Sequence, residues 1–306
     1  MTSSRYHRAV NTPGKTPLSA AVVVLTTGER KSALEALDAS LAAGTSATEG
    51  ARRCELVLVA NTAEPVFMPT WKVVTAGTNL GIPGGRNFGV ADTDADVVFF
   101  LDDDAVALTP DLVERCLAMF EANPQVGAIG FRLVVSGTNR TLKRWNPRLG
   151  ARQVEHPGEV TAFPGGASAV RRKAFDEVGG FCSEFFYALE ETDLAWRLLD
   201  KGWSVRYEPG LLLEHPETVI GRHVGALRQT ARNRVWVARR NLPVPVAALY
   251  VSLWFLRTVI LERSMQSIRS MWQGSVEGLQ TLPGTRRPLQ WATIWKMTRQ
   301  GRPPII

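Results

Sequence analysis

Short runs of apolar, mostly β-branched residues alternate with segments of helical spacing in the first third of the chain. This alternation constrains the fold more than any other feature. The runs are Ala20–Leu25, Glu55–Ala60, Trp71–Thr75 and Asp96–Leu101. Runs of this length and composition are typical of strands that are buried on both faces of a sheet. Strands that alternate with helices favour a mainly parallel sheet with helices on both faces.

The segments between and after these runs are expected to be helices. Lys31–Ala42 and Asn79–Ala91 are the first two, and Thr109–Ala122 is a third in which Thr109 caps the N-terminus and Pro110 fits the first turn. The later strands are predicted at Gln125–Val135, Glu159–Val170 and Trp203–Tyr207, and the later helices at Ala174–Val178 and Glu191–Asp200.

The size of the chain allows one large domain, or one domain with an appendage. It has 306 residues, of which 45% are apolar and 21% charged, so it is not a disordered chain. The three cysteines lie far apart and form neither a disulfide framework nor a metal-binding spacing. The polar start of the chain lacks the apolar core of a secretory signal. We therefore expect a reducing, cytoplasmic compartment.

The positive charge is concentrated in the last part of the chain. From Arg222 onward there are 14 Lys and Arg against two acids, whereas residues 1–221 hold 22 bases and 27 acids. Such asymmetry predicts a C-terminal region that meets an anionic surface. Nucleic acid is disfavoured as that surface because no recognised binding module accompanies the charge.

An apolar segment, Val244–Leu261, lies within this basic region. Arg257 interrupts it, and its length of about 18 residues is marginal for a membrane span. Five of the nine tryptophans follow Arg222, and five arginines precede the segment. This pattern favours a helix that lies in an anionic membrane surface, on the inner face of the plasma membrane. The alternatives are a packed C-terminal helical layer and a contact between copies in a homo-oligomer.

Asp102, Asp103 and Asp104 directly follow the apolar run that ends at Leu101. Adjacent carboxylates repel one another, and a fold that gathers them usually offers a compensating cation. Alternate side chains of an extended segment point the same way, so Asp102 and Asp104 are expected to face one site and Asp103 another. Hard oxygen ligands suit Mg²⁺ or Mn²⁺ shared with substrate phosphates. The alternative is a solvated acidic turn that caps the next helix.

A second group of carboxylates, Glu190, Glu191 and Asp193, lies at the start of an expected helix. One alternative is simple capping, because the helix dipole favours negative charge there. The other is a general base that takes the proton of an acceptor hydroxyl. His215 follows the apolar run Gly210–Leu213 and is a possible third metal ligand, although a lone histidine is more often structural.

The ordered set of motifs resembles the family 2 glycosyltransferases over roughly residues 18–240. The motifs are AVVVLTT at the first strand, NLGIPGGRNFGV from Asn79, FFLDDDA from Phe99, the long segment Phe163–Trp203, LEHP from Leu213 and RNR from Arg232. The resemblance implies an α/β GT-A fold: a Rossmann-like, mixed, mainly parallel sheet flanked by helices, here with a helical C-terminal extension. It also implies an inverting, metal-dependent sugar transfer from a nucleotide-sugar to a hydroxyl of a glycan or lipid-linked acceptor.

The resemblance assigns a role to each matching position. The metal ligands are Asp102, Asp104 and His215, for Mn²⁺ or Mg²⁺, and the base is Glu191. The donor-binding residues are Thr26, Thr27, Asn61, Asn79, Gly81, Arg86, Asn87, Asp102, Asp103 and Asp104. The residues on the acceptor side are Gly165, Gly166, Glu190 and Asp193.

Two departures from the family pattern weaken parts of this assignment. Val59-Ala60-Asn61 replaces Val-Asp-Asn, so the carboxylate that commonly contacts the nucleobase is missing. Glu190-Glu191-Thr192-Asp193 replaces Glu-Asp-x-Asp, which keeps a carboxylate on a side chain one methylene longer. A catalytically degenerate, membrane-bound scaffold is therefore one alternative.

Two enzyme classes are also weighed. A sugar nucleotidyltransferase would need a Gly-rich phosphate loop after the first strand, where this chain has TTGERKS. A dinucleotide-dependent oxidoreductase is disfavoured because GIPGGRNFG follows the third strand. We predict a hexosyl- or deoxyhexosyltransferase with a flexible arm at 1–17, a GT-A domain at 18–221 and a basic helical region at 222–306.

Overall fold

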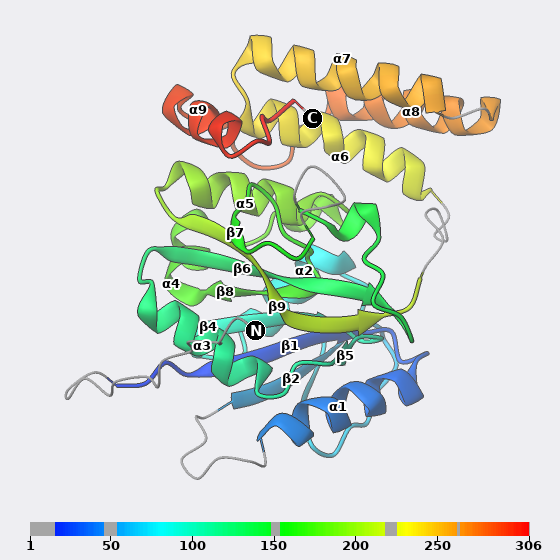
Figure 1. The fold of residues 1–306 in the computed structure, drawn as a ribbon. Coiled ribbons are helices and arrows are strands. Elements are labelled where there is room, and N and C mark those ends of the chain that lie inside the picture. Colours follow the sequence, from blue (N-terminus) through cyan, green and yellow to red (C-terminus); the bar gives the residue numbers. More distant parts are fainter. Residues whose placement is uncertain (1–15, 46–53, 148–153, 218–224, 262–263, 306) are drawn as a thin grey trace.

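The computed structural model describes residues 16–45, 54–147, 154–217, 225–261 and 264–305 (Figure 1). The predicted arm and the boundary near Arg222 lie largely or wholly outside these ranges. The strands are β1 Ala20–Thr26, β2 Cys54–Ala60, β3 Lys72–Thr75, β4 Val97–Asp102, β5 Val106–Ala107, β6 Val126–Val135, β7 Gly158–Glu159, β8 Ala167–Arg171 and β9 Ser204–His215. The helices are α1 Lys31–Thr45, α2 Gly81–Val90, α3 Leu112–Ala122, α4 Arg172–Val178, α5 Glu190–Asp200, α6 Ala226–Asn241, α7 Val244–Leu261, α8 Met265–Gln280 and α9 Trp291–Arg299.

The strands form one mixed sheet in the order β3-β2-β1-β4-β8-β6-β9-β5, with β7 paired to β9. Strands β1, β2, β3 and β4 run parallel to one another, and β6 and β9 are also parallel to each other. Strand β8 runs the other way between β4 and β6. The carboxyl ends of β1, β4 and β9 therefore reach the same edge of the sheet, which is where ligands bind in sheets of this kind.

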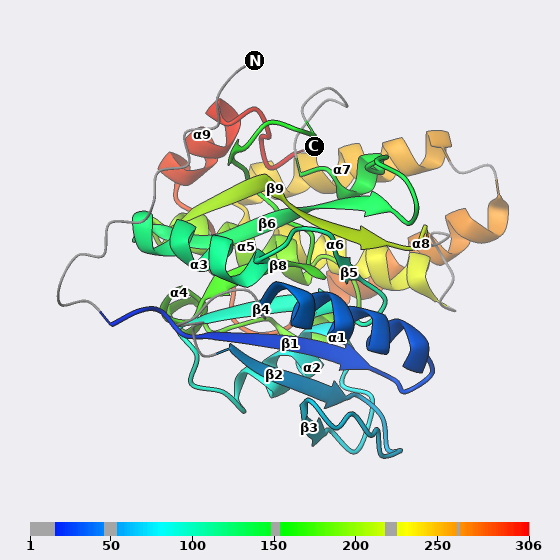
Figure 2. The same cartoon turned by 60° about the horizontal axis from the view of Figure 1, so that its bottom comes forward.

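Successive residues of the central strands face opposite layers of helices. Val22 and Val24 of β1 pack with α1 and α3, whereas Val23 packs with α2, α4 and α5. Figure 2 shows α1 and α3 on the first of these faces. The two predicted layers and the four early strands are thereby confirmed.

Glycines let α2 lie directly on β1. A Cβ atom at Gly85 would lie 2.5 Å from a methyl group of Leu25, and one at Gly89 would lie 2.5 Å from a methyl group of Val23. The motif GIPGGRNFG therefore sets how closely this helix approaches the sheet.

Three predictions for the secondary structure were wrong in detail. Helix α3 begins at Leu112, and Thr109 does not cap it: its hydroxyl donates to the carbonyl of Gly210 and accepts from the N–H of Leu212. The expected strand Glu159–Val170 forms only at its two ends, as β7 and β8; residues 160–166 between them are not a strand, and they include Pro164, which donates no ladder hydrogen bond. The expected strand Trp203–Tyr207 continues to His215 as β9, with a register shift against β6.

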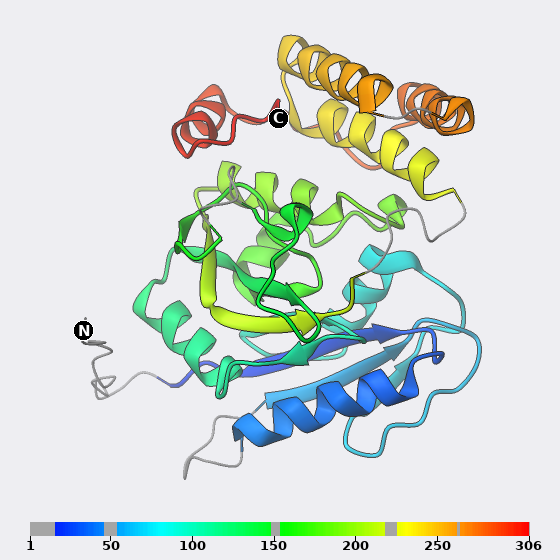
Figure 3. The same ribbon diagram turned by 45° about the vertical axis from the view of Figure 1, so that its right-hand side comes forward.

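The C-terminal helices form a layer against α5 (Figure 3). Helix α6 lies between α5 and the pair α7 and α8, and its Trp236, Val237 and Ala238 belong to the same core as the sheet. Gly274 and Gly278 of α8 lie against the backbone of α6. Helix α6 is packed against the domain, as expected for a C-terminal helical layer. Helix α7, in contrast, is mostly exposed. Among the described helices, α7 is the one long and apolar enough to cross a membrane. Its mean hydropathy is 1.8, and 6% of this 18-residue segment is buried.

Candidate functional site

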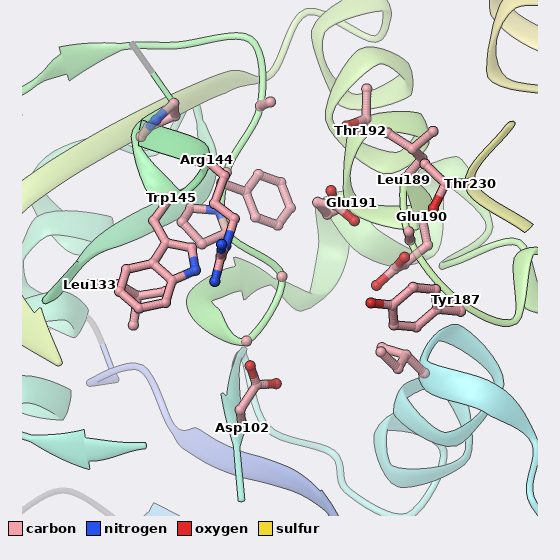
Figure 4. Close-up of a pocket in the computed structure, with 18 of the residues that line it drawn as sticks. Asp102, Leu133, Arg144, Trp145, Tyr187, Leu189, Glu190, Glu191, Thr192 and Thr230 are labelled. Atoms are coloured by element: carbon pink, nitrogen blue, oxygen red, sulfur yellow. The ribbon is translucent and has the colours of Figure 1, made fainter. Parts of the chain in front are cut away.

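A cavity of about 2000 Å³ lies at the carboxyl edge of the sheet. Asp102 lies at its base, Glu190 and Glu191 on one wall, and Arg144 and Trp145 on the opposite wall (Figure 4). The predicted residues that line it are Thr26, Thr27, Asn61, Asn79, Gly81, Arg86, Asp102, Asp103, Asp104, Gly165, Gly166, Glu190, Glu191 and His215. The fold thus brings together side chains from β1, β4, β9 and α5.

The three aspartates make different contacts, as expected, but a turn causes this and not an extended segment: β4 ends at Asp102, and the N–H of Ala105 donates to the carbonyl of Asp102 at 3.1 Å. Asp103 accepts hydrogen bonds from Thr26 at 2.9 Å and from Arg30 at 2.8 Å. Asp104 lies 3.0 Å from Nε2 of His215, and Asp102 lies 3.6 Å from the same nitrogen. The ligand atoms of Asp102, Asp104 and His215 all lie within 4.8 Å of one another, close enough to hold one metal ion.

The imidazole of His215 is oriented for a cation. Its Nδ1 lies 2.7 Å from the carbonyl of Pro216, and a carbonyl only accepts, so Nδ1 carries a proton. Nε2 therefore faces the two carboxylates either with a second proton or with a lone pair directed at a metal. Burial lowers the pKa of His215, but the hydrogen bonds to Asp102 and Asp104 raise it to about 10. A proton thus occupies, in the metal-free protein, the place that suits a divalent ion.

Position 166 requires a glycine because its backbone lies against the carboxylate of Asp102. A Cβ atom there would lie 2.0 Å from the carboxylate of Asp102, and the carbonyl of Gly166 accepts from the N–H of Asp102 at 3.1 Å. A Cβ atom at Gly165 would similarly lie 2.6 Å from the guanidinium of Arg86. The two glycines let the β7–β8 connection pass directly over the acidic cluster.

Arg86 connects the acidic cluster to the second carboxylate group. Its guanidinium donates to Glu190 at 3.1 Å and reaches Asp102 at 3.4 Å. It also lies 5.8 Å from the ring centroids of Phe100 and Phe181. Arg86 is 4% exposed, so its charge acts in a poorly solvated region. Burial raises the pKa of Asp102, but the hydrogen bond from His215 and the charge of Arg86 bring it below its ordinary value.

A strained loop positions Glu190 and Glu191. Phe186, Ala188 and Leu189 have φ values of 62°, 67° and 69°, which non-glycine residues rarely adopt. Asn233 of α6 is fully buried and donates to the carbonyls of Phe185, Tyr187 and Ala188, at 2.9, 2.6 and 2.9 Å. The C-terminal region thus holds the loop that precedes the expected base.

The carboxyl group of Glu191 has a perturbed pKa. Burial raises it well above the ordinary value, and the neighbouring carboxylate of Glu190 raises it further. A carboxylate with a raised pKa is a stronger proton acceptor than an exposed one. Glu191 is therefore suited to take a proton from a hydroxyl group in the cavity.

Two predicted residues lie away from the cavity. The amide of Asn87 donates to Phe181 and Ser183 and accepts from the N–H of Phe181, so it is used to hold that segment. Asp193 is fully buried between Arg197 and Arg240, which lie at 2.7 and 3.0 Å, and these charges lower its pKa although burial raises it. Asp193 joins α5 to α6 and does not reach the acceptor side.

Asn61 and Asn79 line the cavity, but their amides are engaged with the chain. Asn61 donates to Asn79 and to the carbonyl of Gly81, and accepts from the N–H of Leu80. These bonds shape the start of α2.

Several lining residues were not found from the sequence. Arg30 forms ion pairs with Asp103 at 2.8 Å and Asp104 at 2.6 Å, and Trp145 packs edge-on against His215 with ring centroids 5.4 Å apart. The only signal for Arg30 was a basic residue just after the first strand. Trp145 lies in a segment to which the pattern assigns no element.

Residues 54–179 match the profile described as Glycosyl transferase family 2. The chain carries a family 2 glycosyltransferase domain. The matched range of this domain includes Asp102–Asp104 and Gly165–Gly166, and ends before Glu191 and His215.

Two glycosyltransferase relatives and one solved structure are similar to this chain. The pre-mycofactocin glycosyltransferase of Mycobacterium tuberculosis is 33% identical over 170 residues, which cover 52% of this chain and 33% of that protein. The O-antigen chain rhamnosyltransferase RfbN of Salmonella typhimurium is 28% identical over 150 residues, 45% of this chain and 47% of that protein. The match thus spans about a third to a half of these relatives. The crystal structure of GalNAc-T7 with UDP, GalNAc and Mn²⁺ has a TM-score of 0.60 at 14% identity, covering 87% of this chain and 57% of that one, which confirms the GT-A fold.

Proposed function

We propose that this glycosyltransferase moves a sugar, a hexose or deoxyhexose, from a nucleotide-sugar to a hydroxyl of a glycan or lipid-linked acceptor with inversion. The observation that carries the proposal is one cavity with a metal-ligand set at its base and Glu191 on its wall. The domain match and the glycosyltransferase relatives support the reaction class.

The residues at the base of the cavity fit a divalent ion such as Mn²⁺ or Mg²⁺. Oδ1 of Asp104 is buried and lies 3.0 Å from Nε2 of His215, which also lies 3.6 Å from the carboxylate of Asp102. A bound ion would neutralise the diphosphate of the donor. Arg30, which is part-exposed and paired with Asp103 and Asp104, supplies a further positive charge at this end.

The proposed transfer is a single displacement. Glu191 accepts the proton of the acceptor hydroxyl while the oxygen of that hydroxyl forms a bond to the anomeric carbon. The bond from that carbon to the diphosphate oxygen breaks, and the nucleoside diphosphate leaves with the electron pair. Attack on the face opposite the leaving group inverts the anomeric configuration, as in inverting glycosidases with water replaced by an alcohol. The buried pair of Arg86 and Glu190 holds the wall from which Glu191 acts.

We further propose that residues 222–306 attach the GT-A domain, residues 18–221, to the inner face of the plasma membrane as a peripheral protein. The support is the net positive charge of this region and the exposed apolar surface of α7, α8 and α9, which includes Leu256, Ile260, Trp272, Trp291 and Trp295. Asn233 makes α6 part of the catalytic unit as well.

A thermal-shift panel of nucleotide-sugars, with and without Mn²⁺, tests the donor and metal assignments. A ligand that binds only the folded state raises the melting temperature. We expect one nucleotide-sugar to stabilise the chain in an Mn²⁺-dependent way, and then to release its nucleoside diphosphate. Stabilisation without release would support the degenerate scaffold, and no stabilisation by any donor would contradict the proposal.

A further inference from the structure

The cavity continues beyond Glu191 along the C-terminal helices. Its walls there are formed by Gln229, Thr230 and Arg234 of α6 and by Tyr250, Leu253, Trp254 and Arg257 of α7. The ring of Tyr250 packs edge-on against Trp196 of α5, with centroids 6.0 Å apart. This extension is therefore attached to the helix that carries Glu191, and the transfer described above uses none of its side chains.

Two arginines in this extension share one aromatic ring. The guanidinium carbons of Arg234 and Arg257 lie 3.6 Å and 5.2 Å from the ring centroid of Trp254. Arg234 also donates to the hydroxyl of Tyr250 at 3.3 Å.

In the part of the chain that the structure describes, Arg234 and Arg257 have no anionic partner, in contrast to three other arginines of the same region. Among the described residues, no carboxylate lies within 4.0 Å of Arg234 or Arg257. By contrast, Arg228 and Arg232 pair with Glu277, and Arg240 pairs with Asp193. Two positive charges held close together without an anion favour an anionic ligand.

A buried donor lies at the same place. Nε1 of Trp254 is buried and has no hydrogen-bond acceptor among the residues that the structure describes. A buried N–H without a partner is unfavourable, so an oxygen from a ligand is its natural acceptor. The ring of Trp254 and the two guanidinium groups around it thus offer several donors to one anion.

An apolar stripe on α7 begins beside this cluster. Leu249, Leu253, Leu256 and Ile260 follow helical spacing on one face of α7, and they are between 40% and 68% exposed. Leu253 lines the cavity, so the stripe is continuous with it. An occupant that matches both features has an anionic group followed by a long apolar chain.

We infer that this extension binds an acceptor in which a phosphate ester joins the sugar-accepting part to a long apolar alcohol. The phosphate oxygens accept from Arg234, Arg257 and Trp254, and the apolar chain lies on the stripe of α7. The acceptor hydroxyl then reaches Glu191 within the same cavity. This assignment rests on the proposed function, because it names the acceptor class of that transfer.

Binding of farnesyl phosphate to the full chain, measured by calorimetry without divalent metal, tests the inference. Farnesol and inorganic phosphate are matched probes that each lack one half of the ligand. We expect farnesyl phosphate to bind roughly tenfold more tightly than either, and the double variant Arg234→Gln/Arg257→Gln to lose roughly tenfold in affinity. Arg269→Gln, on an exposed position of α8 outside the cavity, should bind like wild type.

Equal affinity for farnesol and farnesyl phosphate, or an unchanged affinity in the double variant, would overturn the inference. Binding to phosphatidylglycerol vesicles is measured for wild type and the double variant as well. If the double variant loses vesicle binding but keeps its affinity for farnesyl phosphate, the two arginines bind the membrane surface and the inference is wrong. Arg257→Gln alone, at an exposed position, replaces the double variant if that fails to fold. Mn²⁺-dependent nucleotide binding is measured in parallel. Its absence in wild type would contradict the proposed function, whereas the result with farnesyl phosphate would still report on the binding of the phosphate ester.

Discussion

The guanidinium of Arg86 lies 3.1 Å from the carboxylate of Glu190, and both residues are more than nine-tenths buried. Arg86 also reaches Asp102, so one cation touches both carboxylate groups of the site. The charge that holds the acidic cluster in place is therefore the same charge that fixes the residue next to Glu191.

Replacing Arg86 with Met should destabilise the protein by about 3 kcal/mol, because it leaves the buried charge of Glu190 without a partner. Urea unfolding monitored by circular dichroism measures the loss. The double variant Arg86→Met/Glu190→Gln should recover part of it, since the unpaired charge is then removed. Losses that simply add would show that the two residues are not coupled.

Glu191→Gln should stabilise the protein at neutral pH. Because the folded-state pKa of Glu191 is raised above its ordinary value of 4.5, the folded protein binds more protons than the unfolded chain above that pH, and stability falls as pH rises. Each pH unit by which the folded pKa exceeds the ordinary value removes about 1.4 kcal/mol, which the glutamine variant would regain. The difference in melting temperature from wild type should vanish below about pH 4. The exposed Glu64→Gln serves as the control, and an equal effect in both variants would contradict the raised pKa of Glu191.

His215→Gln should weaken Mn²⁺ binding by more than about tenfold, because it removes a ligand whose orientation the carbonyl of Pro216 fixes. Electron paramagnetic resonance of free Mn²⁺ gives the affinity directly. His156→Gln, at an exposed position outside the cavity, is the matched control. Unchanged affinity in the His215 variant would remove this residue from the metal site.

Asn233→Ala should lower kcat more than the affinity for the donor. Asn233 positions the strained loop before Glu190. Its loss removes the donor to the carbonyls of Tyr187 and Ala188, whereas the carbonyl of Phe185 keeps Arg232, and the cost is about 1–3 kcal/mol of stability. The comparison is kcat against the donor dissociation constant, with Asn123→Ala on an exposed helix end as control. If kcat and the affinity for the donor fell by the same factor, Asn233 would have a general structural role.

The sequence predicts the strands and the acidic cluster because both depend on local pattern. Runs such as Ala20–Leu25 identify buried strands wherever they pack. The separation of Asp103 from Asp102 and Asp104 was also expected, but a turn after Asp102 produces it and not an extended strand. His215 joins the cluster because β9 ends at the same edge of the sheet as β4.

The remaining features depend on contacts between distant segments. Asp193 pairs with Arg240, 47 positions away on α6, so the local pattern of charges at the start of α5 could not distinguish a buried pair from an acceptor contact. Arg30 meets Asp103 and Asp104 across more than 70 positions, through a loop whose path the sequence does not fix. The positive φ values before Glu190 involve non-glycine residues and leave no signal in composition.

The role of Glu191 is tested most directly by the rate at which Glu191→Gln releases nucleoside diphosphate, using the nucleotide-sugar that stabilises wild type. Removing a general base typically lowers such a rate about 10²–10⁴-fold. We predict a loss in this range with Mn²⁺-dependent donor binding unchanged. Release at the wild-type rate by a folded variant that still binds the donor would contradict the assignment of Glu191 as the base.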